Sequence, residues 1–253
     1  MQENKAFITR HADKGTWQIN KDELKQNLPE DEANLVLGVL SEELPEKTET
    51  TLKMEGLIRS LRLGDKVFES LPQGRNIVIS IDSAKDRAKL TNDLVCARID
   101  QLSNKNKKTS NKNGKDVDII RIEDLNLRKL LSDADEATWA PYADMMKNEG
   151  ISENEALVRW MNDMYNSKPE VDDKIHPTEA IERHQKLIKN IFNNITSENS
   201  SITFLGIGHS GTLGYFQREN MNEDAKLGDE PEFCQIYQFN TDGKFLNTAK
   251  IKA

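Results

Sequence analysis

Cysteine and long apolar runs are what this sequence has least of. Two cysteines, Cys96 and Cys234, occur in 253 residues, and their separation matches no metal-ligand spacing. Two cysteines cannot form the disulfide framework of small secreted domains, so we expect a reducing compartment. No apolar run is long enough to span a bilayer, and the N-terminus lacks the apolar segment of a secretory signal. We therefore expect a cytoplasmic protein with no membrane partner.

The share of apolar residues is also low, and negative charge outweighs positive. Hydrophobic residues make up 36% of the chain and charged residues 31%, which indicates a large solvated surface with polar insertions. The chain is still long enough to bury a substantial core. Its formal net charge of -8 argues against nucleic acid as a partner. An anionic substrate would need a locally positive pocket.

β-favouring runs that alternate with helical patterns determine the expected fold class. Strands are predicted at residues 6–9, 76–81 and 117–122 and in SITFLGIG, which begins at Ser201. Helical patterns separate them, and the C-terminal segment FCQIYQFNTDGKFLNTAKI predicts a hairpin that turns at Asp242 and Gly243. This order predicts an α/β protein: a three-layer α/β/α sandwich with a mostly parallel, doubly wound sheet, a helical insertion and a C-terminal hairpin.

We expect residues 1–253 to form one domain with two insertions. Residues 103–115, SNKNKKTSNKNGK, are basic and low in complexity, and they predict a flexible loop. The alternative for this loop is a nucleic-acid-binding arm, whose binding would depend steeply on salt. Residues from about 127 to 170 predict a helical insertion that roofs a pocket.

Two of the predicted strands lead into histidine. His11 ends the run FITRH, and His209 ends the run FLGIGH. Because ligands of open α/β sheets bind at the carboxyl ends of the strands, both imidazoles would emerge at one site. Arg10 precedes His11, and Arg87 begins the helix after strand 76–81. A guanidinium stays charged and can hold two phosphate oxygens, so the four side chains predict a phosphate site.

In sequence order these residues resemble the motifs of the histidine phosphatase superfamily, which includes cofactor-dependent phosphoglycerate mutase. The Arg-His-Gly signature is similar to Arg10, His11 and Ala12, with alanine in place of glycine. The runs LKMEG and LRLG, within residues 52–64, resemble a Leu-x-x-x-Gly helix start with a later Leu-Gly. The other matches are Ser83, Arg87, Ala88 and Thr91 for Ser-x-x-x-Arg-Ala-x-x-Thr, Glu179 with Arg183, and His209 for the second histidine.

The resemblance implies a metal-independent phosphomonoesterase that acts through a phosphohistidine on a small phosphorylated substrate and needs no cofactor. His11 would attack phosphorus, while Arg10, Arg87 and a protonated His209 surround the phosphoryl oxygens. The leaving oxygen needs a proton from a carboxylic acid. Mutase-type members use a glutamate after the strand that follows the Arg-Ala motif, which points to Glu123. Asp124, Asp13 and Glu136 are the alternatives for this role.

Other functions stay open at this point. Phosphoryl transfer of the phosphoglycerate mutase type would use the same histidine, but DKGTW after Ala12 lacks the family's Glu-Ser and Asn pattern. A catalytically inactive phosphate-binding or scaffold protein of the same fold is a second alternative. His176 and His184 fit no zinc spacing, and we interpret them as a helix-start residue and a surface residue.

Overall fold

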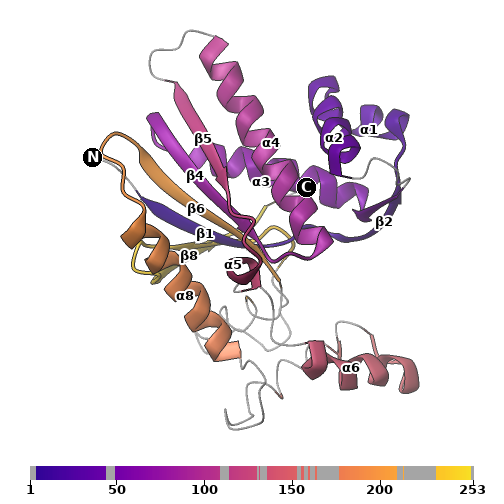
Figure 1. Ribbon diagram of the computed structural model, residues 1–253. Helices are drawn as coiled ribbons and strands as arrows, with labels where there is room; N and C mark the ends of the chain where they lie inside the picture. The colour runs from indigo at the N-terminus through magenta and orange to yellow at the C-terminus, as the bar shows by residue number, and fades with distance from the viewer. Residues whose placement is uncertain are drawn as a thin grey trace.

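A six-stranded sheet forms the centre of the computed structural model, which describes residues 4–43, 49–108, 114–129, 131, 136–152, 155, 156, 159, 163, 177–209, 213 and 232–251. Its strands are β1 (Lys5–Arg10), β4 (Gly74–Asp82), β5 (Lys115–Arg121), β6 (Ser201–Gly208), β7 (Ile236–Phe239) and β8 (Phe245–Ala249). They lie in the order β5-β4-β6-β1-β7-β8 (Figure 1). Pairs from β5 to β1 are parallel, and those that join β7 and β8 are antiparallel. The predicted mostly parallel sheet and C-terminal hairpin are confirmed.

Helices cover both faces of this sheet, as the predicted three-layer sandwich requires. The helices are α1 (Lys21–Asn27), α2 (Glu30–Glu43), α3 (Met54–Ser70), α4 (Asp86–Lys108), α5 (Leu125–Lys129), α6 (Glu136–Asn148) and α8 (Pro177–Asn194). Helices α3 and α4 lie against one face and α8 against the other, while α6 lies apart from the sheet in the view of Figure 1. No helix in the described part of the chain is long and apolar enough to cross a membrane.

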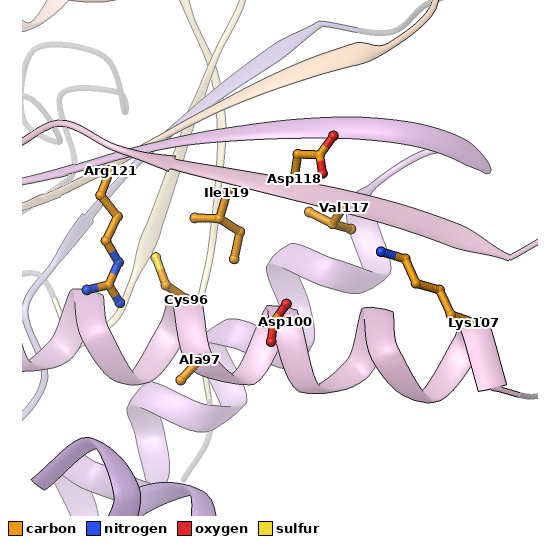
Figure 2. Close-up of a pocket in the computed structure, with 8 residues that line it drawn as sticks. All are labelled: Cys96, Ala97, Asp100, Lys107, Val117, Asp118, Ile119 and Arg121. Atoms are coloured by element: carbon orange, nitrogen blue, oxygen red, sulfur yellow. The ribbon is translucent and has the colours of Figure 1, made fainter. Parts of the chain in front are cut away.

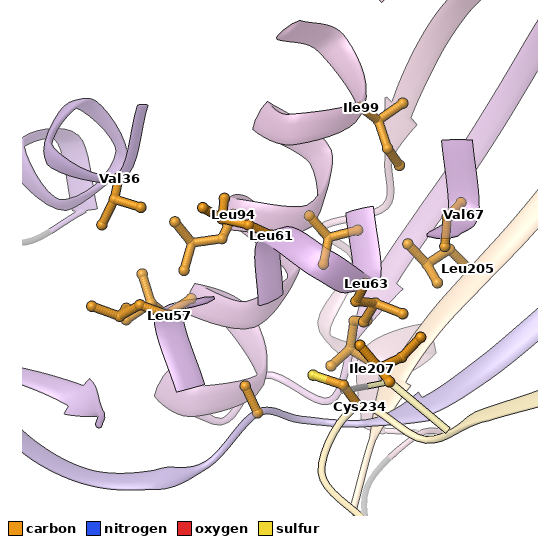
Figure 3. Close-up of a cluster of buried hydrophobic side chains, with 14 of the residues drawn as sticks. Val36, Leu57, Leu61, Leu63, Val67, Leu94, Ile99, Leu205, Ile207 and Cys234 are labelled. Carbon is orange, nitrogen blue, oxygen red and sulfur yellow. The ribbon is translucent and has the colours of Figure 1, made fainter. Parts of the chain in front are cut away.

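The central strands are apolar on both faces because each face has its own core. On β6, Phe204 joins the cluster beneath α8, whereas Leu205 and Ile207 join the larger cluster beneath α3 and α4. Alternate side chains of a strand point to opposite faces, so a continuous apolar run fits a strand that is covered on both sides. Figure 3 shows the larger cluster, where Val67 and Leu63 of α3 lie beside Leu205 and Ile207 of β6.

The boundaries of the basic segment differ from the sequence-based prediction. Residues 103–108 belong to helix α4, and Lys115 begins β5, so the prediction of a loop over 103–115 is wrong at both ends. Residues 109–113 lie outside the described residues. The Ser103 hydroxyl accepts a hydrogen bond from the Val117 N–H at 3.1 Å, and it is fully buried. This contact comes from a neighbouring strand, and local composition does not reveal such partners.

A small two-stranded ribbon follows His11, and the sequence did not predict it. Strands β2 (Lys14–Gln18) and β3 (Glu49–Leu52) pair antiparallel. The residues of β2 alternate between exposed and half-buried, so the strand carries no apolar alternation that would mark it. The ribbon lies directly after the loop that carries the candidate nucleophile.

Candidate active site

The two histidines meet because their strands are neighbours. Strands β1 and β6 are parallel and adjacent, with Arg10 opposite Gly208. The His11 N–H donates to the Gly208 carbonyl at 3.0 Å, which continues the pairing beyond the end of β1. The ring centroids of His11 and His209 are 5.0 Å apart at an interplanar angle of 66°. Both rings are buried, so the carboxyl edge of the sheet holds a pair of imidazoles shielded from water.

Two hydrogen bonds determine the tautomer of His11. Its Nδ1 lies 2.7 Å from the Ala12 carbonyl oxygen, which can only accept, so Nδ1 carries the proton. The Arg87 Nε–H donates to His11 Nε2 at 2.9 Å, which requires a lone pair on Nε2. The imidazole is therefore neutral, and its basic nitrogen faces a guanidinium.

The surroundings of His11 keep it neutral over the physiological pH range. Burial is the largest cause and lowers the pKa of His11 to about 2, with further lowering by His209, Arg87 and Arg10. The hydrogen bond to Ala12 opposes this shift without cancelling it. A neutral imidazole with an available lone pair is the nucleophilic form of histidine.

Helix α4 supplies two groups of the site from one face. Arg87 and Thr91 are four residues apart, so both side chains point the same way. The Thr91 hydroxyl accepts the Ala12 N–H at 3.0 Å and donates to the Arg87 carbonyl at 2.7 Å. The threonine thereby ties the loop after His11 to the turn of helix that carries Arg87.

Ser83 joins the second histidine to strand β4. Its Oγ lies 2.6 Å from His209 Nε2, and its N–H donates to the Ile207 carbonyl at 3.0 Å. Ala84 follows with a φ of +64°, a left-handed conformation that side chains rarely adopt. Its N–H donates to the Asp82 carboxylate at 2.9 Å, and the same carboxylate accepts from Arg128 Nε at 3.0 Å. These bonds hold the loop that positions Ser83.

Lack of space explains why the LKMEG run has glycine at position 56. A Cβ at Gly56 would lie 2.6 Å from the Asp13 carbonyl oxygen, so only glycine lets α3 approach the loop after Ala12. The Lys53 N–H donates to the same carbonyl at 3.1 Å. Ala12 itself is fully buried. Its methyl group is accommodated where the resembling motif has glycine.

An aromatic residue that the motifs do not include completes the described site. The Arg10 guanidinium carbon Cζ lies 3.9 Å from the centroid of the Phe233 ring, and the same ring is 5.8 Å from the His11 ring. Phe233 precedes β7 in a polar stretch, DEPEF, that carries no apolar periodicity. Nothing in the sequence alone marks it as a neighbour of Arg10.

The candidate acids lie farther out. Glu123 is exposed after β5, and no described residue forms a hydrogen bond or ion pair with it. Strands β4 and β6 separate β5 from β1, a distance of about 14 Å at the usual spacing. Asp124 accepts from two N–H groups that begin α5, and Asp13 pairs with Arg59 at 3.1 Å. The side chain of Glu136 lies outside the described residues.

Two residues of helix α8 differ in their surroundings. His184 is only 3% exposed, and its Nε2 is 3.9 Å from the Cβ position of Gly208, so the interpretation as a surface residue is wrong. Its position on the apolar face of α8 explains its burial. Arg183 pairs with Glu179 at 2.6 Å along the outside of the helix. His176 lies outside the described residues.

The described residues hold no group of three or more His, Cys, Asp or Glu side chains placed to bind a metal ion. They do form a groove of about 450 Å³ between α4 and β5, far along the sheet from the histidines (Figure 2). Its two cations are paired: Arg121 with Asp93, and Lys107 with Asp116 at 2.6 Å. The groove is therefore not part of the candidate site.

No protein-family model and no curated protein matches the chain. Several solved structures are similar to it. A phosphoglycerate mutase from Bacillus anthracis str. Sterne is 14% identical at a TM-score of 0.45, over 100% of this chain and 93% of that one. A mycobacterial glucosyl-3-phosphoglycerate phosphatase is 10% identical at a TM-score of 0.46, over 97% and 96%.

A third similar structure, "Mycobacterial hydrolase 2", is 10% identical at a TM-score of 0.47, over 94% of this chain and 82% of that one. At these identities and TM-scores the likeness carries no weight in assigning an activity. The assignment rests on the geometry of the histidines and arginines.

Proposed function

We propose that the protein is a phosphomonoesterase that forms a phosphohistidine at His11 from a small phosphorylated substrate. The observation that carries this proposal is the double hydrogen bonding of one imidazole. Ala12 holds the proton on Nδ1, and Arg87 faces the lone pair on Nε2. This arrangement provides a neutral nucleophile and a phosphate-binding cation at the same point.

The first step transfers the phosphoryl group to His11. When a phosphate group enters, the Arg87 guanidinium turns from Nε2 to the phosphoryl oxygens, which frees the lone pair. Nε2 then forms a bond to phosphorus as the bond from phosphorus to the leaving oxygen breaks. His209, whose ring is 5.0 Å from that of His11, and Arg10, the residue before His11, bind the remaining oxygens and offset their charge.

The second step returns the enzyme to its starting state. A water molecule attacks phosphorus, the P–N bond breaks, and inorganic phosphate leaves with His11 neutral again. The water loses a proton to the base that protonated the leaving oxygen in the first step. We assign this role to Glu123, since Asp13 and Asp124 already bind other groups. Because the leaving oxygen is bonded to the phosphorus that His11 attacks, this assignment requires the segment after β5 to bring the Glu123 carboxyl within hydrogen-bond distance of that oxygen when substrate binds.

Phosphate release from a panel of phosphomonoesters tests the proposal. The panel is assayed from acidic to neutral pH with a chelator present, for the wild type, His11→Asn and Arg183→Gln. We expect release by the wild type and Arg183→Gln, and loss of about 10⁴-fold or more in His11→Asn. Activity that His11→Asn retains, or a wild type inert on every panel member, would contradict the proposal.

A further inference from the structure

We propose that Phe233 is a positioning residue for Arg10, which it holds in the orientation that binds phosphate. This inference rests on the proposed function and extends it, because the motifs that led to His11 do not include Phe233. The ring lies 3.9 Å from the Arg10 guanidinium carbon, and its centroid is farther, 5.8 Å, from that of the His11 ring. The nearer contact is the one with Arg10, so we assign its effect on the reaction to that residue.

The contact has the geometry of a cation–π interaction. The Arg10 guanidinium carbon lies 3.9 Å from the ring centroid, well inside the distance at which such interactions stabilise a cation. Arg10 is 4% exposed, so little water weakens the attraction. The face of a phenyl ring also restricts the rotation of a planar guanidinium, which lowers the entropy that phosphate binding would cost.

A tight turn presents Phe233 to Arg10. The Gln235 N–H donates to the Glu232 carbonyl at 3.0 Å, and the Gln235 side-chain oxygen accepts the Glu232 N–H at 3.0 Å. The third residue of the turn, Cys234, has a φ of +59°, where glycine is the usual occupant. A side-chain-bearing residue persists in this conformation when its surroundings hold it there.

Cys234 is held from two sides. Its side chain is fully buried in the larger core, where Figure 3 shows it among Leu63 and Ile207. Its N–H donates to the Arg10 carbonyl at 3.1 Å. The same turn therefore fixes Arg10 twice, at the backbone through Cys234 and at the guanidinium through Phe233. This double attachment is the reason to assign a positioning role to the turn.

A double-mutant cycle tests the inference. Phe233→Leu keeps apolar bulk and removes the aromatic face, whereas Phe233→Tyr keeps the face. Both changes are made in the wild type and in Arg10→Gln, and binding of inorganic phosphate is measured by calorimetry together with kcat and KM. We expect Phe233→Leu to weaken phosphate binding about 2- to 30-fold and to raise KM more than it lowers kcat. Phe233→Tyr should restore wild-type values.

In the Arg10→Gln background, Phe233→Leu should have no further effect on phosphate binding, because the cation is absent. An equal loss in both backgrounds would overturn the inference, as would wild-type phosphate binding in Phe233→Leu. Circular dichroism establishes that each variant is folded. The ring-current shift of the Arg10 Nε–H in NMR spectra reports the contact without any activity.

These readouts separate two kinds of failure. If the wild type binds phosphate and hydrolyses the panel while Phe233→Leu behaves like it, the positioning role fails and the proposed function stands. If the wild type neither binds phosphate nor hydrolyses any panel member, the proposed function fails. In such a protein, a ring-current shift of the Arg10 Nε–H would show that Phe233 contacts Arg10 for structural reasons only. That result would overturn the proposed role of Phe233 in phosphate binding.

Discussion

The carboxyl edge of β1 and β6 and the groove between α4 and β5 both gather charged residues, but the partners of their cations differ. At the edge, the guanidinium of Arg87 faces an imidazole nitrogen and that of Arg10 a phenyl ring. In the groove, Arg121 pairs with the Asp93 carboxylate and Lys107 with that of Asp116. A carboxylate offsets the charge of a cation that it contacts, whereas an aromatic ring or a neutral imidazole does not.

The pKa of His11 is consistent with this difference. Arg87 and Arg10 both lower it, in addition to burial and His209. Positive potential at the edge thus acts on the same group that we propose as the nucleophile. The side chains of the groove have no such arrangement.

A matched pair of arginine substitutions, one in each region, should give the largest difference in kcat/KM. We expect Arg87→Ala to lower kcat/KM about 10²–10³-fold, equivalent to about 3–4 kcal/mol of transition-state stabilisation. Arg121→Ala removes an arginine of the groove and should change kcat/KM by no more than about 2-fold. Steady-state kinetics on the best panel substrate give both values. Equal losses in the two variants would remove the distinction between the edge and the groove.

The two regions should also differ in how acid affects stability. The pKa of His11 lies near 2 in the folded chain and near 6.5 when unfolded, so the unfolded state binds more protons between these values. Stability from His11 is complete above pH 6.5 and is lost as the pH falls toward 2. The slope from this group is at most about 1.4 kcal/mol per pH unit. Denaturant titrations should find a shallower acid dependence in His11→Gln.

Asp93 beside the groove should have the opposite dependence. Burial raises the pKa of Asp93 from 3.8 to about 6, so the folded state binds more protons in that window. Its contribution to stability therefore falls as the pH rises from 3.8 to 6. Asp93→Asn should remove this decline in the same titrations. If it steepened the decline, or if His11→Gln kept the full acid dependence, the description of the two environments would be wrong.

The smallest expected effects come from two substitutions that should both lower the free energy of unfolding, of which one alone should also lower kcat/KM. Thr91→Val removes the acceptor of the Ala12 N–H, and Ser103→Ala removes that of the Val117 N–H beside the groove. Each should lower the free energy of unfolding by about 1–3 kcal/mol, because a buried N–H loses its partner. Thr91→Val alone should also lower kcat/KM, by about 10-fold. Comparable activity losses in both variants would indicate general destabilisation.

How much the sequence predicts depends on whether a feature is local. The run NIVISI predicted its strand because β-branched residues covered on both faces are continuous in the chain. The histidines could be placed together because parallel strands bring their carboxyl ends to one edge. Thr91 and Gly56 appeared in motifs, and their contacts with Ala12 and Asp13 supply the physical reasons.

Features that depend on distant partners could not be predicted. The end of α4 depends on Ser103 meeting β5, and the burial of His184 depends on the packing of α8 over β6. Strands β2 and β3 are polar and pair across a helical segment. Phe233 reaches Arg10 through the strained turn at Cys234, for which the sequence contains no glycine or asparagine signal.

The most direct measurement of the central claim is to trap the phosphorylated intermediate. The protein is mixed with a phosphate-labelled substrate from the panel and quenched in alkali, in which a phosphorus–nitrogen bond survives, and the label is then mapped by peptide sequencing. The account predicts an acid-labile label on His11 that is absent from His11→Asn. Phosphate release without any such label, or a label on another residue, would contradict it.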